Sequence, residues 1–168
     1  MTIYVSNLAD LETHARAVRP ERLISIIQPE FQPPTPTAVS PERHLRVPVH
    51  DIAEPVPGSI LPERHHVEVI VRFLDDWGAG DPLMVHCLAG VSRSSATALL
   101  AHVLTTGDPF VSARALREAA PHAWPNRRIV ALADTVLDCR GRLRDAVDAM
   151  GPASTERLGT LVALPVEG

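Results

Sequence analysis

The sequence contains no lysine, so its permanently positive side chains are all arginines. Its formal net charge is −4, and the arginines are spread along the chain without forming a basic run. Proteins that bind nucleic acid mainly through its phosphates need a concentrated positive face. We therefore expect no nucleic-acid partner.

Cysteine is also scarce, because the chain contains only Cys87 and Cys139, which lie far apart. Two such cysteines do not form the disulfide framework of a small secreted domain. Residues 1–18 lack the charged start and long apolar core of a signal peptide. No apolar run approaches the roughly 20 residues that span a membrane. These absences predict a cytoplasmic protein with no membrane partner.

What is present fits an ordinary globular domain. The chain has 168 residues, of which 45% are hydrophobic and 21% are charged, enough to bury a core of its own. We predict a single domain over residues 1–168. The tail, residues 151–168, is left open: it either docks an apolar segment on the body or is partly loose.

Short apolar runs alternate with segments of helical periodicity. Strands are expected at residues 2–6, 22–28, 43–51 and 82–86, and helices at 8–18, 62–77, 92–106, 111–120 and 126–147. The proline-dense segment 29–42 is expected to be a surface loop; its role is left open. This alternation predicts an α/β fold with a central, mostly parallel sheet of four to five strands flanked by helices.

The segment HCLAGVSRS, residues 86–94, lies between a predicted strand and a predicted helix, where open α/β sheets bind their ligands. Gly90 allows successive backbone N–H groups to converge, and the helix start adds further N–H groups and the positive end of its dipole. Arg93 can bind two oxygens of a phosphate. We predict a loop that binds phosphate or sulfate, formed by Leu88, Ala89, Gly90, Val91, Ser92 and Arg93. Ser92 can line this loop, cap the helix or do both.

Cys87 lies at the base of this predicted loop. Cationic groups and helix N-termini stabilise a thiolate, so we expect Cys87 to be ionised at neutral pH and to attack a bound phosphorus atom. The alternative is a buried structural cysteine, the usual role of a free thiol. The presence of Gly90, Arg93 and Ser94 at these spacings favours the nucleophile.

The pattern His-Cys-x5-Arg-Ser resembles the signature of the cysteine-dependent protein tyrosine phosphatases, and the ending AGVSRS resembles their dual-specificity branch. Weaker similarity extends over roughly residues 5–138. The resemblance implies a phosphotyrosine-phosphatase-like fold and hydrolysis of phosphate monoesters without metal or cofactor. Cys87 would form a cysteinyl-phosphate, which water would then hydrolyse.

The resemblance also implies roles for the neighbours of Cys87. Arg93 would bind the equatorial oxygens of the phosphoryl group, Ser94 would donate a hydrogen bond to the sulfur, and His86 would fix the loop. The substrate would be a phosphorylated protein or a small phosphate monoester, with phosphotyrosine favoured and phosphoserine or phosphothreonine left open. A multiply phosphorylated lipid is disfavoured, because the loop has no lysine and no second arginine.

Two further residues have alternatives. The family uses an aspartate as general acid, and Asp51, at the end of a predicted strand, fits this role better than Glu54. Asn126, directly after Pro125, either supports the phosphate loop or caps the following helix. At the level of function, the alternative to an enzyme is a catalytically weak phosphate-binding module that keeps the loop and lacks an acid.

Overall fold

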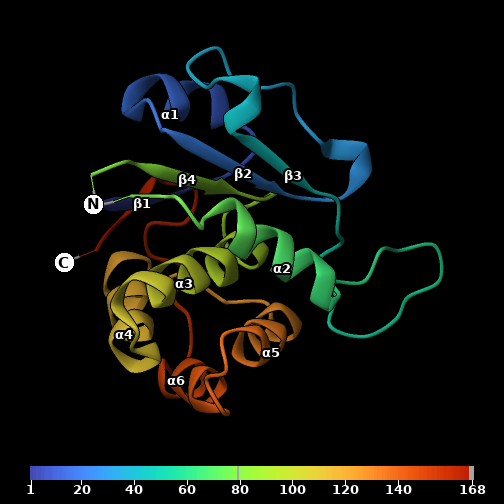
Figure 1. The fold of residues 1–168 in the computed structure, drawn as a ribbon, viewed down its shortest axis with the longest axis vertical. Coiled ribbons are helices and arrows are strands. Elements are labelled where there is room, and N and C mark those ends of the chain that lie inside the picture. Colours follow the sequence, from blue (N-terminus) through green and yellow to red (C-terminus); the bar gives the residue numbers. More distant parts are fainter. Residues whose placement is uncertain (79, 167–168) are drawn as a thin grey trace.

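The structure is a computed structural model that describes residues 1–78 and 80–166 (Figure 1). The strands are β1 (Thr2–Ser6), β2 (Arg22–Ile26), β3 (His44–Val47), β4 (Leu83–His86) and β5 (Val162–Pro165). The helices are α1 (Leu11–Val18), α2 (Arg64–Phe73), α3 (Arg93–Thr106), α4 (Pro109–Ala119), α5 (Arg127–Val136) and α6 (Arg142–Ala149). The proline-dense segment contains two single turns of 3₁₀ helix, Pro29–Phe31 and Pro41–Arg43.

The strands form one sheet in the order β3-β2-β4-β1-β5. Strands β1 to β4 are parallel, and β5 pairs antiparallel with β1. In the centre, Val85 of β4 lies between Ile24 of β2 and Val5 of β1. The predicted α/β fold with a mostly parallel sheet of four to five strands is confirmed.

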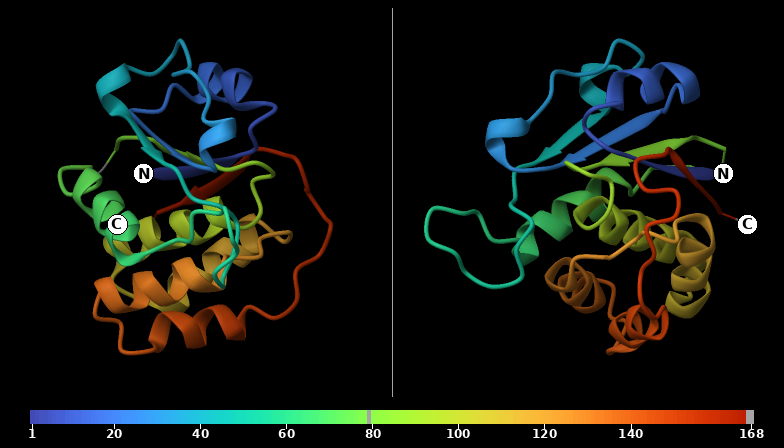
Figure 2. Two further views of the ribbon diagram at one scale, coloured as in Figure 1. Left: turned by 90° about the vertical axis from the view of Figure 1, so that its right-hand side faces the viewer. Right: turned by 180° about the vertical axis from the view of Figure 1, so that it is seen from behind.

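Helices and loops cover both faces of the sheet, as Figures 1 and 2 show: α1 and the proline-dense segment lie on one face and α2 to α6 on the other. Leu23 and Met84 belong to the apolar cluster that includes residues of α1, whereas Ile24 and Val85 belong to the main core. Strands buried on both faces read as continuous apolar runs. This burial explains why residues 22–27 show almost no polar alternation.

Helix α3 lies in the middle of the helical layer and is buried over Arg93–Val103. It begins directly after the loop that follows β4, so its N-terminus lies at the carboxyl edge of the parallel strands. It ends at Gly107, which has the left-handed conformation of a helix C-cap (φ 70°). Among the described residues, no helix is both long enough and apolar enough to cross a membrane.

The prediction of one helix over residues 126–147 is wrong. The structure has two helices, α5 and α6, separated by a turn in which Asp138, Arg140 and Gly141 have positive φ. The Asp134 carboxylate accepts hydrogen bonds from the backbone N–H groups of Gly141 (2.8 Å) and Leu143 (2.9 Å). This buried carboxylate satisfies donors at the start of α6 and so stabilises the break.

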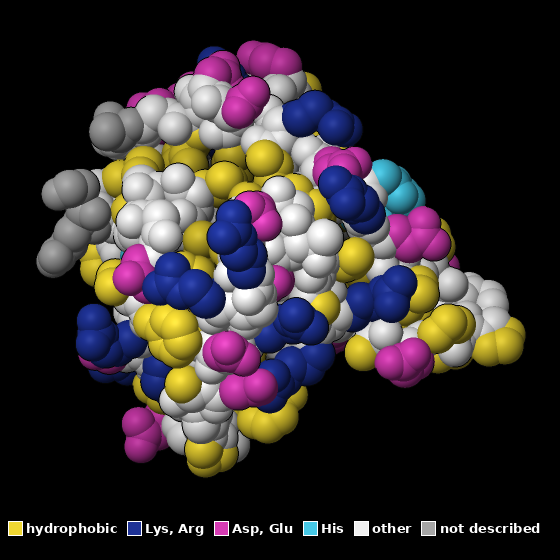
Figure 3. All heavy atoms as spheres, turned by 60° about the horizontal axis from the view of Figure 1, so that its bottom comes forward, with side chains coloured by type: hydrophobic (Ala, Val, Ile, Leu, Met, Phe, Trp, Pro, Cys, Tyr) yellow, Lys and Arg dark blue, Asp and Glu magenta, His cyan; other side chains and the backbone are white. Residues whose placement is uncertain are grey.

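The tail docks on the body, which was one of the two expectations for it. Val162 and Leu164 of β5 are buried, and the Val166 N–H donates to the Met1 carbonyl. On the helical side of the molecule, Figure 3 shows arginines interspersed with acidic side chains. Arg127 and Asp148 form one such ion pair, between α5 and α6.

Candidate active site

Residues 87–92 form a loop between β4 and α3, at the carboxyl edge of the parallel strands. Gly90 has φ 74°, and a Cβ atom at this position would lie 3.1 Å from the Ser6 carbonyl oxygen. A side chain here would therefore meet both an unfavourable backbone conformation and the end of β1. Glycine lets the loop turn tightly against the sheet.

The carbonyl groups of the loop are held from outside it. Three of them accept hydrogen bonds from backbone N–H groups of other segments: Leu88 O from Leu8 N (3.1 Å), Val91 O from Trp124 N (2.9 Å) and Ser92 O from Asn126 N (3.2 Å). Within the described part of the chain, no backbone N–H of residues 88–93 donates a hydrogen bond to the protein. The loop thus offers a set of unpaired donors, as an anion-binding site requires.

Cys87 lies at the base of the loop and is 2% exposed. Its Sγ is 3.1 Å from Ser94 Oγ, in the first turn of α3. The sequence led us to expect this hydroxyl close to the sulfur, and the structure brings the two together. The hydroxyl can donate to a sulfur that carries negative charge.

The Arg93 guanidinium is buried and is held on one side only. Its Nη1 donates to Gln28 Oε1 (2.7 Å) and to the Val49 carbonyl (2.8 Å). Its Nε is buried and has no protein partner among the described residues. A buried cation with an unpaired donor is costly unless an anion binds there. Gln28 was not predicted from the sequence, because its role depends on the pairing of β2 with β4.

Asp51 lies beside the loop. Its Oδ1 accepts hydrogen bonds from Ser92 Oγ (2.7 Å) and Asn126 Nδ2 (2.8 Å). The Ser92 hydroxyl therefore binds Asp51 and makes no capping bond with α3. Glu54, the alternative acid, is exposed and has no hydrogen bond with the phosphate loop among the residues described. The geometry favours Asp51.

Asn126 caps a helix and also contacts the loop through its backbone. Its Oδ1 accepts from the backbone N–H groups of Arg128 (3.1 Å) and Ile129 (3.0 Å), which caps α5. Its Nδ2 holds Asp51, and its own backbone N–H holds the carbonyl of Ser92. One residue thus ties a helix, the aspartate and the phosphate loop together.

His86 is fully buried behind the loop. Its Nδ1 lies 3.2 Å from the Cys87 carbonyl oxygen, and its Nε2 lies 2.5 Å from Ser25 Oγ. Burial lowers its pKa to about 4, so the ring is neutral at neutral pH. Ser25 was missed in the sequence; its signal was a single hydroxyl in an otherwise apolar run of β2.

Four exposed apolar side chains lie in the loop or within five positions, along the sequence, of a residue that is hydrogen-bonded to it or to Arg93. We call this set the apolar rim: Phe31, Val56, Leu88 and Trp124, each between 46% and 54% exposed. Leu88 belongs to the loop, and the backbone N–H of Trp124 is hydrogen-bonded to it. Leu88 and Trp124 thus place apolar surface at the loop, beside the polar Asp51 and Asn126.

Comparison with solved structures identifies the fold. DUSP15 matches with a TM-score of 0.62 at 22% identity, over 90% of this chain and 94% of that chain. The Yvh1 phosphatase domain from Chaetomium thermophilum matches with a TM-score of 0.60 at 18% identity, over 84% and 93%. PTPMT1 in complex with PI(5)P matches with a TM-score of 0.61 at 15% identity, over 83% and 94%.

Comparisons of sequence, in contrast to those of structure, find no match. No protein-family model matches the chain, and no curated protein matches it significantly. The match to the solved structures nevertheless covers most of both chains in each comparison. The chain has the fold of the dual-specificity and protein tyrosine phosphatases.

Proposed function

We propose that this protein hydrolyses phosphate monoesters through a cysteinyl-phosphate intermediate, as a tyrosine or dual-specificity phosphatase of the cytoplasm. The observation that carries the proposal is the distribution of hydrogen bonds around residues 87–93. The carbonyl groups are held from outside, whereas the N–H groups and Arg93 Nε are unpaired beside a cysteine sulfur. Such a loop can hold a phosphoryl group in line with the sulfur.

In the first step, the Cys87 thiolate attacks the bound phosphorus and the bond from phosphorus to the leaving oxygen breaks. Arg93 and the N–H groups of the loop stabilise the charge on the three equatorial oxygens. Asp51 gives a proton to the leaving oxygen. Its Oδ1 already accepts from Ser92 and Asn126, which leaves Oδ2 to carry that proton.

In the second step, water attacks the phosphorus of the cysteinyl-phosphate and the sulfur leaves as a thiolate. Asp51, now ionised, accepts the proton of the water. Ser94 Oγ, 3.1 Å from the sulfur, donates to it as negative charge returns. Inorganic phosphate then leaves, and the cycle is closed, because Asp51 again carries a proton and Cys87 is again a thiolate.

The apolar rim supports an aromatic phosphate ester as the substrate. Trp124, whose backbone N–H is hydrogen-bonded to the loop at Val91, offers an exposed ring surface, and such surfaces pack well against a phenyl ring. PTPMT1 was solved in complex with PI(5)P. The loop of this chain has no lysine and, apart from Arg93, no arginine, so we favour phosphotyrosine over a multiply phosphorylated lipid.

The test compares the wild type with Cys87→Ser, using p-nitrophenyl phosphate as substrate. We expect the variant to lose all turnover and, because the serine still fits the loop, to keep binding phosphate. Wild-type enzyme quenched in acid during turnover should contain a phosphate on Cys87, detected by mass spectrometry. Turnover that persists in the variant would contradict the mechanism. Phosphate binding without turnover in the wild type would instead favour the phosphate-binding module.

A further inference from the structure

A continuous chain of polar side chains runs from the phosphate loop across three neighbouring strands to the proline-dense segment. Ser25 Oγ lies 2.5 Å from His86 Nε2 and 2.7 Å from His44 Nε2. His44 Nδ1 lies 2.9 Å from Thr35 Oγ1. Ser25 and His86 are 0% exposed and His44 is 7% exposed. Buried polar groups of this kind are held by one another because water does not reach them.

The geometry fixes the direction of every hydrogen bond in the chain, starting from the loop. The Cys87 carbonyl can only accept, so His86 Nδ1 carries a proton and donates to it. Burial lowers the pKa of His86 to about 4, and a neutral ring has only one N–H. His86 Nε2 must then accept, and the Ser25 hydroxyl donates to it.

The remaining bonds follow from the single proton of each hydroxyl. Ser25 has used its proton, so it accepts from His44 Nε2. Burial is the main cause that lowers the pKa of His44 to about 4, and its Nδ1 therefore accepts from the Thr35 hydroxyl. Thr35 Oγ1 in turn accepts from Arg46 Nη2 (3.1 Å). Each hydrogen bond in this series thus has one donor and one acceptor.

This series of hydrogen bonds determines the orientation of the peptide group between Cys87 and Leu88. Its carbonyl is held by His86, and in a trans peptide the next N–H points the opposite way. The Leu88 N–H is thus directed away from the buried ring. We propose that Ser25 and His44 are positioning residues of the active site, which keep His86 in its Nδ1–H form and so keep the Leu88 N–H available to the sulfur and the phosphoryl group.

The catalytic consequence rests on the proposed function, but the tautomers do not. They can be read directly from the two-dimensional NMR correlation of histidine ring protons and nitrogens, without any substrate. At neutral pH we expect His86 to carry its proton on Nδ1 and His44 on Nε2. Observation of His86 protonated on Nε2 would overturn the proposal, whether or not the protein is a phosphatase.

A control residue lies in the helical layer, away from the phosphate loop. Ser112 is also 0% exposed and its Oγ lies 2.8 Å from His102 Nδ1, between α3 and α4. Ser112→Ala removes one buried serine–histidine hydrogen bond, whereas Ser25→Ala removes two, to His86 and His44. Both variants should lose stability, but only Ser25→Ala should alter the active site.

Two measurements separate positioning from stability. We expect Ser25→Ala to lower kcat for p-nitrophenyl phosphate about 10-fold to 100-fold, the range typical of a slightly misplaced reacting group, with a smaller change in KM. We also expect alkylation of Cys87 by iodoacetamide at neutral pH to be slower than in the wild type. Ser112→Ala should match the wild type in both. Equal behaviour of the two variants would overturn the proposal.

Thr35 gives a second pair of variants in case Ser25→Ala does not fold. Thr35→Val removes the hydroxyl that donates to His44, whereas Thr35→Ser keeps it. Thr35 is the member of this series of hydrogen bonds that lies farthest from the phosphate loop. We expect Thr35→Val to change the His44 tautomer populations and to slow alkylation of Cys87 at neutral pH. We expect Thr35→Ser to restore both. Failure of the serine to differ from the valine would contradict the role of the chain.

Discussion

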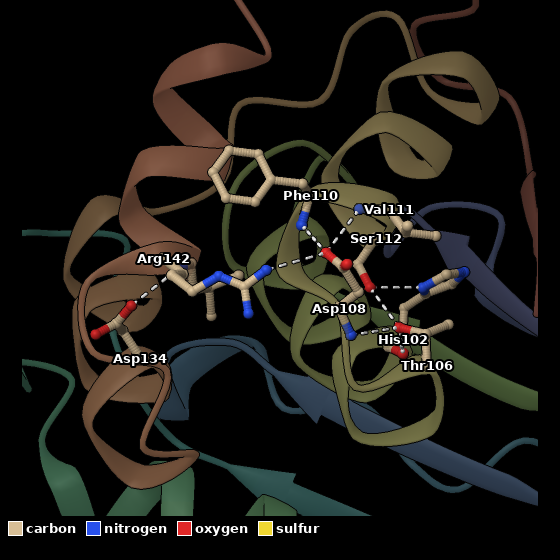
Figure 4. Close-up of polar contacts among 9 residues, drawn as sticks. His102, Thr106, Asp108, Phe110, Val111, Ser112, Asp134 and Arg142 are labelled. Atoms are coloured by element: carbon tan, nitrogen blue, oxygen red, sulfur yellow. Dashed lines mark hydrogen bonds and ion pairs between the residues drawn. The ribbon is translucent and has the colours of Figure 1, made fainter.

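The two ends of helix α3 carry similar polar groups and differ in whether the protein satisfies them. At the C-terminal end, shown in Figure 4, Ser112 Oγ is hydrogen-bonded to His102 Nδ1 (2.8 Å) and lies 2.9 Å from Thr106 Oγ1. The Asp108 carboxylate accepts from the Phe110 N–H (2.8 Å) and caps α4. We call this the closed end, because its polar side chains form hydrogen bonds with one another and with the start of α4.

The N-terminal end has the opposite character. Arg93 Nε is buried without a protein partner among the described residues, and the N–H groups of the loop are likewise unpaired. An unsatisfied buried donor costs about 1–3 kcal/mol. We call this the open end, and its unpaired donors fit the anion-binding site proposed above.

The largest effect should come from replacing the cation of the open end. We expect Arg93→Lys to lower kcat/KM for p-nitrophenyl phosphate about 10³-fold, because an ammonium group cannot bridge two phosphate oxygens as a guanidinium does. Addition of phosphate should also stop raising the melting temperature of the variant. Arg142→Lys, at the closed end, is the control and should behave as the wild type. A loss below 10-fold in Arg93→Lys would contradict the assignment.

The second prediction concerns Asp51, the proposed general acid. Asp51→Ala should lower kcat by about 10²-fold, at the lower end of the usual contribution of general acid catalysis. The pH profile of the wild type should have a basic limb, and this limb should flatten in the variant. Glu54→Ala is the matched control, since Glu54 lies nearby and is exposed. If instead Glu54→Ala flattens the limb, the two roles are reversed.

The position of the loop between β4 and α3 could be predicted because its signal is local. Cys87, Gly90, Arg93 and Ser94 lie within eight consecutive positions, and a strand before them and a helix after them fix their relative placement. The parallel sheet was predictable for the same reason, from short apolar runs separated by helices. Neither prediction required knowledge of which strands are neighbours.

Other features of the site and of the fold could not be predicted, because they depend on contacts between residues that are separated in the sequence. Gln28 reaches Arg93, and Ser25 meets both His44 and His86, only because β2 lies between β3 and β4 in the sheet. The break between α5 and α6 likewise depends on the Asp134 carboxylate folding onto residues seven and nine positions later. Helical periodicity continues through this turn, so the sequence pattern alone predicted one helix.

Two glycines with positive φ allow the two ends of α3 to be compared by the loss of unfolding free energy when each is replaced. Gly107 (φ 70°) has open space at its Cβ position, whereas at Gly90 (φ 74°) the Ser6 carbonyl oxygen lies 3.1 Å away. We expect Gly107→Ala to cost about 1 kcal/mol for its backbone conformation and Gly90→Ala about 2–3 kcal/mol. Urea denaturation measures both. Equal losses would mean that the loop can move away from β1.

A further difference concerns the pH dependence of stability that the buried histidines produce. His44 and His86 each have a pKa of about 4 in the folded protein, against about 6.5 when unfolded. Between these values the unfolded chain binds more protons, so stability is complete above about pH 6.5 and falls as the pH decreases toward about 4. Each histidine contributes at most about 1.4 kcal/mol per pH unit in this window.

Replacing one of the two should therefore reduce this slope, because glutamine can donate to Ser25 without titrating. We expect His44→Gln to have a shallower dependence of unfolding free energy on pH than the wild type between about pH 4 and 6.5. His65→Gln, at an exposed position, is the control and should keep the wild-type slope. Burial also lowers the pKa of His102 at the closed end, so part of the slope should remain in His44→Gln. A slope identical to that of the wild type would mean that His44 is not held neutral, and the proton order assigned to its hydrogen bonds would then be wrong.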